Sequence, residues 1–280
     1  MKKIWELFHR LQTILAEPSD LKTAQELCVL TKQIALLAES GLICAQQEYR
    51  ENFDFFKDVN TKDPLSFGQC GDHVYWKVIE SVLYIDGAGP MWDFDNLSVE
   101  FGKSTVFSPW TEAEFDAVMI GRGVTAIGTD AFHGAHISNV LIPDTVKTIR
   151  DSAFFDARIQ TLILPETLET IEEGIITGFS RVVDTLVVSA NIPNMEPFSL
   201  FNRDDAVATD VILTGERPVN LQMLAESRLF DGVGHYHVRY PANWDTEQGS
   251  FYEKLLPYFP DSDDLFLNNL RTALIPHEFA

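Results

Sequence analysis

A repeat between residues 118 and 210 limits the fold of this chain more than any other sequence feature. Four copies start 22, 22 and 24 residues apart and read VMIGRGVTAIGTDAF (118–132), VLIPDTVKTIRDSAF (140–154), LILPETLETIEEGII (162–176) and LVVSANIPNMEPFSL (186–200). Counted from zero, positions 0, 2, 6, 9 and 14 are apolar in every copy, which makes twenty residues of twenty. A chain that is 45% hydrophobic would place about nine apolar residues there. The copies are therefore predicted to stack around one continuous core.

Each copy predicts one strand followed by a turn. Positions 0 and 2 lie on the same face because side chains alternate along a strand. The residue after position 2 ends the strand in the first three copies, where it is Gly121, Pro143 or Pro165. Positions 6, 9 and 14 then fill the interior from the opposite wall. With less regular strands near 211–213 and 238–240, the ladder has five or six strands at ~4.8 Å spacing.

Position 1 of the copies should point away from this core, yet it is apolar throughout. The residues are Met119, Leu141, Ile163, Val187 and Ile212, and the series ends at Arg239. A large exposed apolar patch usually marks an interface. Three interpretations stay open: the N-terminal helices of the same chain cover this face, the face binds a partner or a second copy, or it is simply exposed. These five residues are the candidate interaction or covered sheet face.

The flanking regions differ from the repeats. Residues 1–60 have the three-and-four spacing of helices and predict a helical hairpin or small bundle. Residues 72–117 read as a β-rich N-terminal cap, and the repeats extend over 118–244. Residues 245–280 predict a helical C-terminal cap, with Ser250 and the run Asp261–Asp264 suited to cap its helices through Leu256 and Leu274. The expected class is α+β.

The wording of the copies resembles the BspA-like, Treponema-type branch of bacterial leucine-rich repeats. The resemblance is carried by GVTAIGTDAF (123–132), IPDTVKTIRDSAF (142–154), LPETLETIEEG (164–174) and the closing HVRYPANW (237–244). The preceding segment matches at Trp76, Leu83, Ile85, Gly87, Gly89, Met91, Asp93, Phe94, Pro109 and Trp110. The resemblance covers about 74–244 and implies a short right-handed solenoid with a strand ladder. It also implies a protein that binds protein partners, often at the bacterial surface, and it brings no catalytic residues.

The charge balance narrows the partner class. With 42 acidic and 21 basic side chains the net charge is −21, which repels nucleic acids and anionic membranes. This acidity either maintains solubility or favours a basic partner. Cys28, Cys44 and Cys70 are too few and too far apart for a disulfide framework or a zinc site, so buried structural thiols are expected. No signal peptide or membrane span is recognised. The expected location is cytoplasmic, or the cell surface or exterior if an export signal precedes this sequence.

Catalytic and metal-binding patterns are weak. The chain has no GxSxG or HExxH motif, and Gly87-Ala88-Gly89 lacks the third glycine of a dinucleotide site. His235 and His237 could share one face, but no further ligand completes a metal site. His133 and His136 are interpreted as turn residues. We therefore expect no enzyme activity, no cofactor and no metal.

Together these patterns predict a non-enzymatic protein-binding scaffold, with a surface or adhesion role as one form of it. The alternative is a structural or regulatory assembly module in which the N-terminal helices mediate oligomerisation. A protein partner is expected in the first case and a homo-oligomer in the second. No nucleic acid or membrane insertion is expected in either.

Overall fold

The computed structural model describes residues 67–94, 108–111, 113–178, 183–201, 208–218 and 220–277. The chain divides into two compact units, residues 1–58 with 277–280 and residues 59–276, and the description below concerns the second. The predicted helical region 1–60 lies outside the described residues, as do Cys28 and Cys44. Among the helices that are described, none has the length and apolar character needed to span a bilayer.

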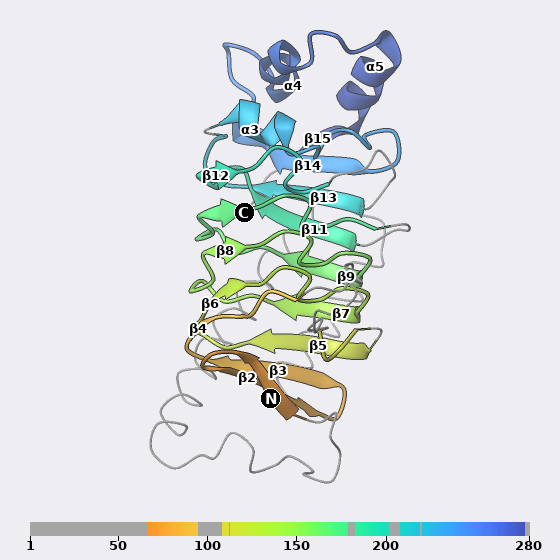
Figure 1. Cartoon of the computed structure of the whole chain (residues 1–280). Helices are drawn as coiled ribbons and strands as arrows, with labels where there is room; N and C mark the ends of the chain where they lie inside the picture. The colour runs from red at the N-terminus through yellow and green to blue at the C-terminus, as the bar shows by residue number, and fades with distance from the viewer. Residues whose placement is uncertain are drawn as a thin grey trace. The chain divides into compact units, whose positions relative to one another are not determined.

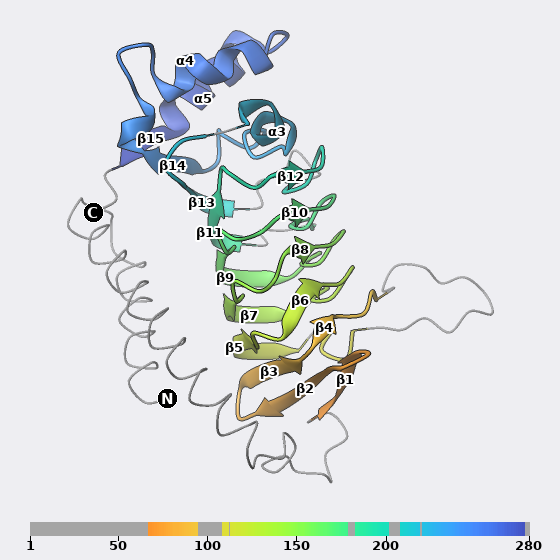
Figure 2. The ribbon, with the colours of Figure 1, turned by 90° about the vertical axis from the view of Figure 1, so that its left-hand side faces the viewer.

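Two sheets form the walls of a solenoid (Figures 1 and 2). The larger sheet has ten strands in the order β1-β2-β3-β5-β7-β9-β11-β13-β14-β15, and the smaller has five in the order β12-β10-β8-β6-β4. Odd and even labels alternate between the sheets over the repeats, so each copy contributes one strand to each wall. This is the strand-turn-opposite-wall path that the repeat predicts, with few helices.

The predicted ladder is confirmed in the larger sheet. Its parallel strands are β5 (Glu114–Ile120), β7 (His136–Leu141), β9 (Arg158–Ile163), β11 (Val183–Ser189), β13 (Ala208–Thr214) and β14 (His237–Pro241). Their register places equal repeat positions side by side, for example Val118 beside Val140 and Val140 beside Leu162. The two additional residues between the third and fourth copies therefore lie in the turns, and the register of the strands does not change.

The opposite wall consists of short strands that carry repeat positions 6 and 9 or lie next to them. They are β4 (Gly89–Pro90), β6 (Val124–Ile127), β8 (Thr148–Ile149), β10 (Thr170–Ile171) and β12 (Asn194–Met195). Of the twenty predicted core residues, nineteen are buried and Ile142 is half-buried. A further core row that the repeat analysis missed lies three residues before each copy and comprises Phe115, Ile137, Ile159, Val183 and Ala208.

Position 14 forms a row of stacked side chains inside the solenoid. The rings of Phe132 and Phe154 are stacked with centroids 5.3 Å apart, and Trp110 stacks on Phe132 at 5.7 Å. The Trp110 Nε1 donates to the carbonyl oxygen of Ala131 at 2.6 Å. Ile176 continues the same position in the next copy and is fully buried. Trp110 therefore begins the row before the first complete copy.

Position 12 of each copy has a left-handed backbone conformation, which the residue types there do not predict. Asp130, Ser152, Gly174 and Phe198 have φ of 51°, 54°, 58° and 61°. For residues other than glycine this left-handed conformation costs roughly 1–2 kcal/mol. Only one of the four copies has glycine there, so packing of the turn against its neighbours imposes the conformation on the others.

The described segment before the repeats is rich in β-strands. β1 (Phe67–Gly71), β2 (Val74–Ile79) and β3 (Val82–Gly87) are antiparallel to one another, and β3 then pairs in parallel with β5. The change from antiparallel to parallel pairing occurs at β3. The solenoid therefore begins with the strand pair β3 and β5.

The C-terminal region contains α3 (Leu221–Glu226), α4 (Phe251–Leu255), α5 (Asp264–Ala273) and β15 (Leu274–His277), with short 3-10 turns at Ala242–Trp244 and Leu256–Tyr258. Ser250 caps α4 and Asp263 caps α5, as predicted. The prediction that the last helix includes Leu274 is wrong, because Leu274 begins β15. Pro276 explains the change, since proline disfavours helical backbone in the residue before it. α3, which the repeat did not predict, begins soon after Pro218.

Candidate functional site

The five predicted outward-facing residues lie in one row across the larger sheet. Met119, Leu141, Ile163, Val187 and Ile212 are direct neighbours in the register of β5, β7, β9, β11 and β13. All five are half-buried, whereas the core residues beside them in the chain are buried, with the exception of Ile142. With strands ~4.8 Å apart, this outer apolar row is about 19 Å long.

Polar groups limit the row at both ends. Tyr84 precedes Met119 in the register, and the Lys77 Nζ lies 6.0 Å from the centroid of the Tyr84 ring. Arg239 follows Ile212, as predicted, and its Nε lies 2.8 Å from Asp210 Oδ2. The outer apolar row is therefore confined to the strands β5, β7, β9, β11 and β13.

A second outer row lies two residues earlier on each strand. Its members are Ala117, Asn139, Thr161, Thr185 and Asp210. Asn139 and Thr161 are only 6% and 8% exposed. The alternation of side chains along a strand would have predicted this row two residues before position 1 of each copy. The sequence alone does not predict that Asn139 and Thr161 are buried.

Asp210 ends the second row beside Arg239. Burial raises the pKa of the Asp210 carboxyl, and the neighbouring Arg239 guanidinium partly opposes that shift. Its Oδ1 is buried without a hydrogen-bond partner among the described residues. The carboxyl is therefore fixed on one side only, by the ion pair with Arg239.

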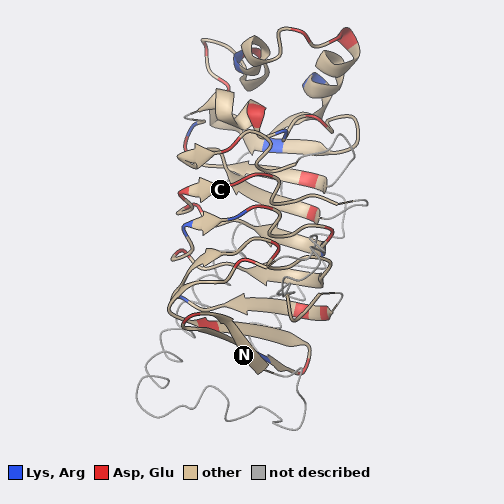
Figure 3. Cartoon of the chain, viewed as in Figure 1, with Lys and Arg blue, Asp and Glu red and all other residues tan. Residues whose placement is uncertain are grey.

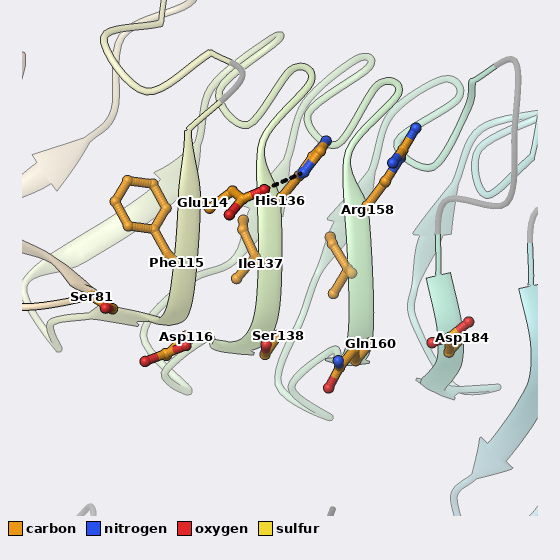
Figure 4. A pocket seen from close by; sticks show the side chains of 11 residues that line it. Ser81, Glu114, Phe115, Asp116, His136, Ile137, Ser138, Arg158, Gln160 and Asp184 are labelled. Carbon is orange, nitrogen blue, oxygen red and sulfur yellow. Dashed lines mark ion pairs between the residues drawn. The ribbon is translucent and has the colours of Figure 1, made fainter. Parts of the chain in front are cut away.

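A groove crosses the first residues of the repeat strands (Figure 4). One row of side chains contains Asp116, Ser138, Gln160 and Asp184, and another contains Glu114, His136 and Arg158. His136 Nδ1 lies 3.4 Å from Glu114 Oε1. The interpretation of His136 as a turn residue is wrong, because it begins β7 and the strand starts earlier than the repeat suggests. His133 does lie in a turn, where its ring stacks on Phe155 at 4.9 Å.

Acidic residues gather at the starts of several strands. Figure 3 shows red segments at the beginning of β5, β11 and β13, which correspond to Glu114, Asp116, Asp184 and Asp210. The basic groups nearby are Arg158, which is exposed, and Arg239, which is paired with Asp210. This edge of the outer face therefore has an excess of negative charge.

The remaining candidate residues for metal binding or catalysis do not form a common site in the described part of the chain. No group of three or more potential metal ligands occurs among the residues that the structure describes. Cys70 is buried, as predicted, and burial raises its pKa to about 12, so the thiol stays protonated and unreactive. His237 lies at the start of β14 and is exposed, and His235 lies in the turn before it.

The repeat geometry agrees with a known sequence family. Residues 107–203 match the family model described as a BspA type leucine-rich repeat region, in six copies. A leucine-rich repeat protein from Eubacterium ventriosum ATCC 27560 is a similar solved structure, with 15% sequence identity and a TM-score of 0.32. The match covers 51% of this chain and 42% of that one, so it spans less than half of that protein. No curated protein matches this chain in sequence.

Leucine-rich repeats generally mediate protein–protein interaction. Each repeat contacts its neighbours and presents one strand, so the repeat as a whole offers an extended face. In this chain that face carries the outer apolar row, the second outer row and the groove. These three features are the candidate site.

Proposed function

We propose that this protein is a non-enzymatic protein-binding scaffold that contacts its partner through the outer face of the ten-stranded sheet. The observation that carries the proposal is the register of the outer apolar row, which aligns five apolar side chains on the face opposite the core. These side chains are not needed to fill the solenoid, whose interior is closed by other positions.

The surroundings of the row support a protein partner. Protein interfaces combine an apolar centre with a polar rim. Here the apolar row is flanked by the second outer row and by a groove in which eight of eleven lining residues are polar or charged. Small-molecule sites are instead predominantly apolar. A net charge of −21 also disfavours nucleic acid as the partner.

The alternative is an assembly module in which residues 1–60 mediate oligomerisation. Those residues lie outside the described part of the chain. That they cover the outer face therefore stays a prediction. Mutual repulsion between two copies of charge −21 weighs against self-association. A role in adhesion at the cell surface, and a cytoplasmic location, both stay predictions.

The test is Ile163→Lys in the full chain, with Glu166→Lys as the control. Ile163 is half-buried at the middle of the row, whereas Glu166 is exposed in the turn after β9. We expect Ile163→Lys to abolish recovery of the partner in pull-down experiments, or to change the melting temperature or oligomeric state if the face is covered. Glu166→Lys should change none of the three. If all three measurements are unchanged in Ile163→Lys, the outer face is not a contact surface.

A further inference from the structure

We draw no further inference here: the strongest candidate, the outer face of the larger sheet over β7 and β9, where Asn139 and Thr161 are buried, belongs to the site already described, and nothing among the described residues shows what covers it.

Discussion

The two faces of the larger sheet are made by consecutive residues of the same strands, yet they differ in what determines their side chains. The inner residues Val118, Val140, Leu162, Leu186 and Val211 are at most 2% exposed. The next residue of each strand belongs to the outer apolar row and is half-buried. The inner face is apolar because the copies must stack around a core. The outer face has no such requirement, so stacking of the copies does not explain its apolar character.

The largest expected loss of unfolding free energy comes from a substitution in the core. Phe154 is fully buried and stacked on Phe132, so Phe154→Ala should lower the free energy of unfolding by about 3–5 kcal/mol. Urea unfolding followed by circular dichroism measures the loss. A decrease under ~1 kcal/mol would mean that the aromatic row does not hold the repeats together.

The neighbouring pair Leu162 and Ile163 tests the two faces within one strand. Leu162→Ala should cost about 2–5 kcal/mol of unfolding free energy, since it empties a fully buried position. Ile163→Ala should cost about 1 kcal/mol or less, because the half-buried side chain loses little apolar contact area. Unfolding of the two variants under identical conditions gives the comparison directly. Equal losses would show that the outer row is part of the core.

The turns that connect the two walls provide a smaller effect. Gly174 has φ of 58°, so Gly174→Ala should lower the unfolding free energy by about 1–2 kcal/mol. Gly174→Asn should cost less, because asparagine tolerates this conformation better. Thermal unfolding ranks the two variants. If alanine is tolerated as well as asparagine, then the backbone conformation at position 12 does not constrain the repeat.

The smallest effect concerns a charge outside both faces of the larger sheet. Burial raises the pKa of Asp93, but hydrogen bonds from the Thr129 N–H and from Arg150 outweigh burial and lower it. Its stabilisation is therefore present above the carboxyl's unfolded pKa and is lost as pH falls through the folded pKa. Asp93→Asn should cost about 1 kcal/mol or less at pH 7, since the pair is partly exposed. Unfolding between pH 3 and 7 should show this difference disappearing toward low pH.

The sequence predicted those parts of the structure that depend on residue type at a fixed repeat position. Strand register, the inner core and the outer apolar row follow from positions 0, 1 and 2 alone. The burial of Asn139 was not predictable, because its place in the repeat predicts a position on the outer face. The groove was not found either, since stacking brings Asp116 and Asp184 to one groove from distant copies. Phe198 also has a positive φ, a conformation that phenylalanine does not favour, so its residue type did not predict the turn.

A photo-reactive amino acid at position 163 of the full chain tests the central claim most directly, with the same substitution at position 166 as control. Position 163 lies in the outer apolar row, and position 166 lies three residues later in an exposed turn. Irradiation in the native cell followed by peptide mapping should give cross-links from position 163 to a partner protein and none from position 166. Equal or absent cross-linking at the two positions, or cross-links confined to residues 1–60 of the same chain, would contradict the account.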